Sequence, residues 1–414
     1  MSEKQWKLLD AVRRIKQATL TVVQAAKLLG LSERQVRRVR RAVEERGARG
    51  VVHGNTGRSP AHRLKASLRE QVVDLMRTKY AGFNDQHFTD KLVEVEKIEI
   101  SRASVRRLLR DAGIGAARRR RPPKHRRRRD RKPQAGLMIL WDGSRHDWLE
   151  GRGPMMCLMG AIDDATSEML PGAHFVDQEC AEGYLRVLLA IVREKGLPWS
   201  AYMDRHGSLK RNDNFWTLEE ELRGKQNPTQ VLRAVELLDI EAIYALSPQA
   251  KGRVERLWGT AQDRLTSELR LADAKTVDEA NEVLRKYAPD HNRRFAVPAQ
   301  EAEPAWRPVR RGLDLERICS FRYEATVPND NAVRLAGAPV IDIPPGRTRQ
   351  SFAKARVEVR QLLDGSWRVY LGDTLIATAG TTAQGELRAL KQTKRSATAR
   401  TFRRGIQRIA ASLP

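Results

Sequence analysis

Three acidic residues occupy positions from which their carboxylates could hold metal ions. Asp142 follows the apolar run GLMILW, Asp204 follows the apolar run WSAYM, and Glu255 lies in a segment whose apolar residues recur at helical spacing. Carboxylate oxygens are hard ligands that suit Mg²⁺ or Mn²⁺. Two such ions can flank a phosphodiester and support an in-line displacement. We predict that these three acids are both the catalytic residues and the ligands of a two-metal Mg²⁺ or Mn²⁺ site.

Other ionisable residues nearby have simpler explanations. Asp163 and Asp164 fall in a predicted hairpin, where aspartate is expected from turn chemistry alone. Glu241 is closer to Asp204 along the chain than the helical glutamate is, but it begins an apolar strand. We therefore keep the helical glutamate as the third acid. For His206 two interpretations stay open, a contact with the reacting phosphate or an ordinary place in a loop.

The segments around these acids are predicted to alternate between strands and helices in a definite order. An antiparallel meander comes first, and parallel strands crossed by helices follow. The predicted strands are 136–142, 155–163, 168–176, 199–204 and 241–246, and the predicted helices are 178–195, 227–239 and 249–269. This is the order of a ribonuclease-H-like core with a mixed five-stranded sheet. In that layout the first and fourth strands end side by side, and the last helix brings its carboxylate to the same place.

The charge of the chain indicates a polyanionic partner. The formal net charge is +26 and the isoelectric point is near 10.5. Cationic contacts to DNA phosphates release condensed counterions, so double-stranded DNA is the expected partner. Between residues 118 and 132, eleven of fifteen positions are Arg or Lys, and two prolines interrupt them, which predicts an extended basic linker. The linker residues expected to contact DNA are Arg118, Arg119, Arg120, Arg121, Lys124, Arg126 and Arg127.

The first part of the chain predicts two helix-turn-helix units. Within residues 5–46, two short helices joined by a tight turn at Gly30 form the first unit, with valines on the inner face of its second helix. A second unit spans about 64–114. The side chains expected to contact DNA are Arg34, Gln35, Arg37, Arg38 and Arg41 in the first unit, with Gln35 able to read a base, and Arg102, Arg106 and Arg107 in the second. The alternative is a helical bundle with a solvated basic face.

Four segments together resemble a known family. They are WDGS at 141–144, AIDDATS at 161–167, MDRHGS at 203–208 and SPQAKGRVERLWGT at 247–260. In combination they resemble the DDE-type insertion-sequence transposases of bacteria, in the retroviral-integrase superfamily, and the ISNCY type most of all. The resemblance extends over nearly the whole chain. It implies the same catalytic triad, Asp142, Asp204 and Glu255. The segment DRHGS departs from many relatives, which have Asn or His and then Gly after the aspartate.

The resemblance implies a DNA transposase. It would bind the terminal inverted repeats of its own insertion sequence and catalyse metal-dependent 3′-end cleavage and strand transfer into target DNA. It would act as a homo-oligomer on DNA, at least a dimer. Lys251, Arg253 and Arg256, which flank the helical glutamate, would contact DNA phosphates, or would form an ordinary solvated helix face. The alternatives are an inactive DNA-binding regulator derived from a transposase, a ribonuclease-H-like nuclease that cuts without joining, and a generic repressor.

The expected fold is a multidomain α+β protein. The expected domains are a helix-turn-helix domain with a basic loop at 1–60, a second helix-turn-helix domain at 61–117, a basic linker at 118–134, a ribonuclease-H-like catalytic core at 135–305, a small β-barrel at 306–380 and a basic tail at 381–414. The barrel would contact DNA or a neighbouring protomer, or serve only for oligomerisation. No signal peptide, long apolar span or paired cysteine motif is present, which predicts a cytoplasmic protein. The resemblance implies that it is bacterial and nucleoid-associated.

Overall fold

The computed structural model describes residues 1–57, 63–116, 129–211, 213, 216–245, 252–346, 349–382 and 387. Contacts divide the chain into two compact units, Met1–Gln71 and Val72–Pro414. Several expected DNA contacts lie outside the described residues, namely Arg118, Arg119, Arg120, Arg121, Lys124, Arg126, Arg127 and Lys251. In the described ranges, no helix is long and apolar enough to cross a membrane.

The first unit contains three helices that the sequence predicted. They are α1 (Glu3–Lys16), α2 (Val22–Leu29) and α3 (Glu33–Arg46), followed by the short η1 (Gly47–Val51). Each of the three α-helices begins with a capping box. A Ser or Thr side chain accepts a hydrogen bond from the backbone N–H of a glutamine three residues later, and the side chain of that glutamine accepts one from the backbone N–H of the Ser or Thr. Helix α2 ends at Gly30, whose φ of 63° suits glycine. This tight turn joins α2 to α3 as predicted.

Three further helices follow, α4 (Ala66–Arg77), α5 (Asp85–Glu94) and α6 (Arg102–Asp111). Asn84 caps α5 and Ser101 caps α6, each by accepting from a backbone N–H in the first turn. Buried aromatic and aliphatic side chains hold the three helices together, among them Phe83, Phe88 and Leu109. Residues 102–111 therefore form the helix that the sequence predicted there, with a buried apolar face and an exposed cationic one.

The sheet of the core has the order β3-β2-β1-β4-β5, which confirms the predicted arrangement. Its strands are β1 (Met138–His146), β2 (Met156–Asp163), β3 (His174–Val176), β4 (Ser200–Met203) and β5 (Glu241–Tyr244). Strands β1, β2 and β3 pair antiparallel, while β1, β4 and β5 run parallel. The parallel pairs need crossover connections, and helices supply them.

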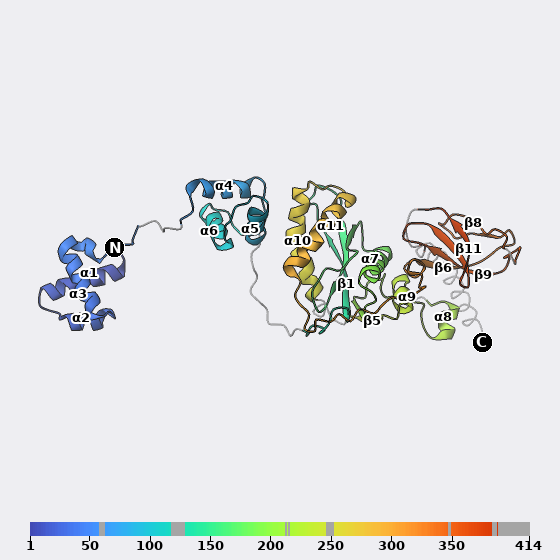
Figure 1. The fold of residues 1–414 in the computed structure, drawn as a ribbon, viewed down its shortest axis with the longest axis horizontal. Coiled ribbons are helices and arrows are strands. Elements are labelled where there is room, and N and C mark those ends of the chain that lie inside the picture. Colours follow the sequence, from blue (N-terminus) through green and yellow to red (C-terminus); the bar gives the residue numbers. More distant parts are fainter. Residues whose placement is uncertain are drawn as a thin grey trace, which may run out of the picture. The chain divides into compact units, whose positions relative to one another are not determined.

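Helices cover both faces of this sheet (Figure 1). Helices α7 (Ala181–Glu194) and α9 (Gln230–Leu237) pack on one face in a cluster that includes Ile139 and Trp141 of β1. Helices α10 (Gly252–Leu271) and α11 (Val277–Phe295) pack on the other face, where Leu140 of β1 and Tyr202 of β4 point. Alternate residues of β1 therefore face different helices, as the two-residue period of a strand requires.

A short helix that the sequence analysis did not predict, α8 (Leu218–Arg223), lies between β4 and α9. Thr217 begins it with a capping box, and the partner in that box, Glu220, is fully buried. Burial opposes ionisation of Glu220, yet hydrogen bonds from the Thr217 and Asn227 backbone and from Arg211 bring its pKa down to about 2. The segment is thus organised around a buried, paired carboxylate.

The predicted C-terminal β-barrel is not formed by the described residues. After α12 (Leu315–Ile318), strands β6 (Phe321–Thr326), β9 (Arg356–Gln361), β10 (Trp367–Leu371) and β11 (Thr374–Ala379) make an open sheet in the order β11-β10-β9-β6. The segments expected to close the barrel form only a ribbon of two residues per strand, β7 (Ala332–Val333) and β8 (Ile341–Asp342). Prolines flank this ribbon, and proline cannot donate to a ladder. Among the described residues no strand pairing joins the edges β6 and β11.

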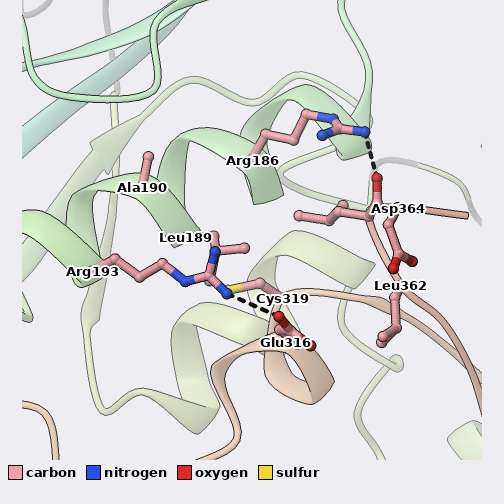
Figure 2. A pocket seen from close by; sticks show the side chains of 9 residues that line it. Arg186, Leu189, Ala190, Arg193, Glu316, Cys319, Leu362 and Asp364 are labelled. Atoms are coloured by element: carbon pink, nitrogen blue, oxygen red, sulfur yellow. Dashed lines mark hydrogen bonds and ion pairs between the residues drawn. The ribbon is translucent and has the colours of Figure 1, made fainter. Parts of the chain in front are cut away.

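This open sheet packs on the core through one continuous hydrophobic cluster, to which Phe321 and Trp367 belong. Arg233 of α9 is buried and donates hydrogen bonds to the carbonyls of Ile318 and Ser320. A cavity of about 330 Å³ lies between α7, the α12 region and the turn that follows β9 (Figure 2). At its wall, Arg186 donates to the Leu363 carbonyl. None of the three predicted catalytic acids lines it.

Candidate active site

The two predicted catalytic aspartates lie on neighbouring strands, just beyond the last pair of the parallel β1–β4 ladder. Asp142 is in β1 and Asp204 directly follows β4. The strands are parallel, and Leu140 pairs with Tyr202, so each aspartate lies two residues beyond the same pair. Both are partly buried. Because the strands run in the same direction, the two carboxylates belong to the same end of the sheet.

Two glycines give room for side chains on either side of Asp142. Gly160 of β2 is its cross-strand partner, and a Cβ at that position would come within 3.1 Å of the Trp258 ring. Gly143 is the next residue of β1, and a Cβ there would come within 2.8 Å of a Glu179 carboxylate oxygen. A glycine inside a strand often marks such a close approach. Asp142 is therefore flanked by an indole on the α10 face and a carboxylate on the α7 face.

Helix α10 contacts β1 through polar groups beside Asp142. The Trp258 indole Nε1 donates to Asp142 Oδ2 at 3.2 Å, and Gln262 Nε2 donates to Ser144 Oγ at 3.2 Å. Glu255 lies one turn before Trp258, on a helix whose Val254, Leu257 and Ala261 are buried against the sheet. Positions three apart are neighbours on a helix surface, so Glu255 stands beside the residue that touches Asp142.

The three acids are not gathered into one cluster. Glu255 is exposed in the first turn of α10. Among the residues described, no three His, Cys, Asp or Glu side chains lie close enough together to hold a metal ion. The structure thus places Asp142 and Asp204 just beyond the parallel β1–β4 ladder, and it places Glu255 on the helix that contacts the first of them.

An acid that the sequence analysis missed, Glu179, also lies at this end of the sheet. Tyr184 donates to Glu179 Oε1 at 2.5 Å, and His206 Nδ1 lies 3.3 Å from the same oxygen. Burial raises the pKa of the Tyr184 hydroxyl, and the negative charges of Glu179, Asp204 and Asp142 raise it further. The Tyr184 hydroxyl is therefore close enough to all three carboxylates for their charges to affect its pKa. The sequence signal for this contact was the glycine directly after Asp142.

Asp163 and Asp164 have structural roles, in agreement with the turn interpretation. Asp163 Oδ1 accepts from the backbone N–H groups of Ala165 and Thr166, and its Oδ2 accepts from Gly136 N. Burial raises the pKa of Asp163 against the effect of these hydrogen bonds. Asp164 has no exposed side-chain surface and forms ion pairs with Arg129 and Arg253.

Several residues expected to contact DNA already have partners in the protein. Arg253 is mostly buried, with 11% of its side chain exposed, and it donates to Asp164 and to the Arg129 carbonyl. Gln35 Oε1 accepts from Ser32 N at 3.1 Å and so completes the capping box of α3. Arg37 pairs with Glu33. The exposed cations of the expected set are Arg34, Arg37, Arg38, Arg41, Arg102, Arg106, Arg107 and Arg256.

Replacing Asp164 by alanine is expected to destabilise the core by about 3–5 kcal/mol, because the change leaves the buried Arg253 without its counter-charge. The midpoint of urea unfolding, followed by tryptophan fluorescence, measures the effect. The exposed Asp130 supplies the control, since Asp130→Ala should leave the midpoint unchanged. An Asp164→Ala midpoint equal to that of the wild type would show that the buried pair does not stabilise the fold.

Comparisons with known proteins agree with these observations. The sequence model of a family described as "Winged helix-turn helix" matches residues 9–70. A putative transposase, y4bF of Sinorhizobium fredii, is 33% identical over 309 residues, which cover 75% of this chain and 66% of the relative. The transposase for insertion sequence IS1202 of Streptococcus pneumoniae is 28% identical over 407 residues, covering 89% of this chain and 84% of the relative. The chain belongs to the insertion-sequence transposases.

The first of these relatives is longer than the aligned region, and the chain spans about two thirds of its length. Solved structures similar to this transposase include the HTLV-2 integrase catalytic core domain in complex with magnesium. It is 15% identical, with a TM-score of 0.26, over 36% of this chain and 85% of that one. A simian T-cell lymphotropic virus intasome is 14% identical, with a TM-score of 0.31, over 76% of this chain and 100% of that one. Scores of this size say nothing specific about the transposase.

Proposed function

We propose that this transposase binds the terminal inverted repeats of its insertion sequence, cleaves the 3′ ends and transfers them into target DNA. The observation that carries the proposal is the placement of the acids. Asp142 and Asp204 each lie two residues beyond the last pair of the parallel strands β1 and β4, and Glu255 lies one turn from the tryptophan that donates to Asp142. A ribonuclease-H-like core with this arrangement suits phosphoryl transfer between DNA strands.

The donor set fits a hard divalent cation. Asp142, Asp204 and Glu255 offer only carboxylate oxygens, which suit Mg²⁺ or Mn²⁺, and two ions would be held when Glu255 joins the aspartates on DNA. Such ions, when bound, would acidify a water or a 3′-hydroxyl and neutralise charge on the leaving oxygen. Glu255 is exposed in the first turn of α10, which leaves it accessible for this role.

The residues of the chain would orient the acids and hold the DNA. Trp258, by donating to Asp142, keeps one carboxylate oxygen turned toward α10. Arg256 is exposed next to Glu255 and is the residue of α10 that we assign to a phosphate contact, since Arg253 is paired with Asp164. Exposed arginines of α3 and α6 would bind the element's ends, with α4–α6 as a second helix-turn-helix unit. The 3′-hydroxyl itself attacks target DNA, so no covalent protein–DNA intermediate is required.

Joining two ends to one target requires at least two copies of the chain on DNA. We propose a homodimer or a larger assembly there, acting in the bacterial cytoplasm on nucleoid DNA. The C-terminal sheet is proposed to contact DNA or a second protomer.

An end-cleavage and strand-transfer assay tests the proposal. Wild-type protein is incubated with labelled duplexes of the element's ends and a plasmid target, with Mg²⁺, with Mn²⁺ and with EDTA. We expect 3′-end cleavage and joined products in either metal and neither product in EDTA. Tight binding without cleavage would favour an inactive regulator. Cleavage without joined products would favour a nuclease.

A further inference from the structure

Glu179 connects the segments that carry the two catalytic aspartates. Its carboxylate lies against Gly143, the neighbour of Asp142 in β1. The same carboxylate lies 3.3 Å from His206 Nδ1, and the backbone N–H of His206 donates to Asp204 Oδ1 at 2.8 Å. Glu179 thus touches the residue after one aspartate and a residue bound to the other.

Glu179 is itself held in place from the core. Tyr184 is fully buried, and its hydroxyl donates to Glu179 at 2.5 Å. The ring of Tyr184 packs against Trp141, which directly precedes Asp142, with ring centroids 5.9 Å apart. The Glu179 side chain keeps 23% of its surface exposed, so it is a partly buried group with a fixed donor. A side chain anchored in this way can fix its contacts more rigidly than a solvated one.

Gly143 is the residue that permits this arrangement. The Glu179 oxygen occupies the space in which any other side chain at position 143 would begin, because a Cβ there would lie 2.8 Å from it. The cavity between α7, the α12 region and the turn that follows β9, in contrast, has its arginines paired and offers no comparable chemistry (Figure 2).

We propose that Glu179 is a positioning residue that sets the separation of Asp142 and Asp204 by bridging the middle of β1 and the segment after β4. It acts through Gly143 and His206, and Tyr184 holds it. This inference rests on the proposed function, since it concerns the same metal site. Residues that support metal ligands from behind typically change metal affinity or activity by about 10–100-fold when they are replaced.

The test measures Mn²⁺ binding to the full chain, freed of metal by chelation, from the electron paramagnetic resonance signal of free Mn²⁺. Glu179→Ala should weaken binding about 10–100-fold and reduce cleavage in parallel. Glu179→Gln keeps an oxygen that accepts from Tyr184, so it should restore binding to within about threefold of wild type. Tyr184→Phe removes that donor, and its Mn²⁺ affinity should lie between those of Glu179→Ala and Glu179→Gln. Glu194→Ala, at an exposed position of α7, is the matched control and should bind as wild type does.

Wild-type Mn²⁺ affinity in both Glu179→Ala and Tyr184→Phe would overturn the proposal. Mn²⁺ binding as weak in Glu179→Gln as in Glu179→Ala would also overturn it, because the negative charge of Glu179, and not its contacts with neighbouring residues, would then determine the affinity. If Glu179→Ala does not fold, the Gln and Tyr184→Phe proteins carry the test. Asp142→Asn distinguishes the role of Glu179 from the metal site itself. If Asp142→Asn binds Mn²⁺ weakly while Glu179→Ala binds it normally, only the role of Glu179 is wrong. Normal binding in Asp142→Asn removes the proposed metal site itself.

Discussion

A Glu255→Gln protein is expected to bind the element's ends as tightly as wild type but to lose both cleavage and joining. The amide preserves the size of the side chain and removes the negative charge that a metal requires. Loss of one ligand should cost about 4 kcal/mol of transition-state stabilisation, or roughly a thousandfold in rate. Single-turnover cleavage of labelled end duplexes in Mg²⁺ measures the rate, and a gel-shift titration measures the binding.

Glu241→Gln is the matched control for this experiment. Glu241 is the glutamate that the sequence offered as the alternative third acid, but it is exposed at the start of β5 and pairs in register with Ser200, at the opposite end of β4 from Asp204. Its replacement should leave cleavage unchanged. Cleavage that survives in Glu255→Gln and disappears in Glu241→Gln would show that the third ligand was assigned to the wrong residue.

Replacing Arg34 and Arg38 together by alanine is expected to weaken binding of the element's ends about 10–100-fold. Both side chains are exposed on α3, the second helix of the helix-turn-helix, which enters the major groove in proteins of this type. Each lost phosphate contact should lower the salt dependence by about one unit, so the slope of log K against log salt should fall by about two. Fluorescence anisotropy over a range of salt concentrations measures both quantities.

The control for the arginine pair removes the same charge elsewhere. Arg285 and Lys286 are exposed on α11, and their double alanine variant should retain end affinity to within about twofold, since distant exposed charges are largely screened. If both double variants lose the same affinity for the element's ends, the net charge of the protein, and not the arginines of α3, determines DNA binding.

The parts of the fold that could be predicted from the sequence are those determined by local signals. The caps at Thr21, Ser32 and Ser101 were visible as residue types at helix starts, and the structure confirms the helices that they begin. The sheet order followed from the alternation of apolar runs and helical patterns, because antiparallel hairpins and parallel crossovers allow few arrangements.

The rest depended on contacts between residues far apart in the chain. Nothing local indicates that Arg253 of α10 pairs with Asp164. The capping box that occupies the Gln35 side chain, in contrast, is local, and its Ser-x-x-Gln pattern was visible in the sequence. The barrel was not confirmed, since the described strands form no closed barrel; alternation predicts strands without saying whether their edges meet. Glu179 was missed because it lies in an irregular segment before α7, although Gly143 indicated that something approaches β1 closely.

The most direct test of the central claim is to locate the metal. Crystals of the full chain with a DNA end and Mn²⁺ would be measured near the manganese absorption edge. We expect anomalous peaks about 2.1 Å from carboxylate oxygens of Asp142 and Asp204, with Glu255 bound to one of the ions. If no peaks lie beside these two aspartates, or if other acids bind the ions, the assignment of the three acids is wrong.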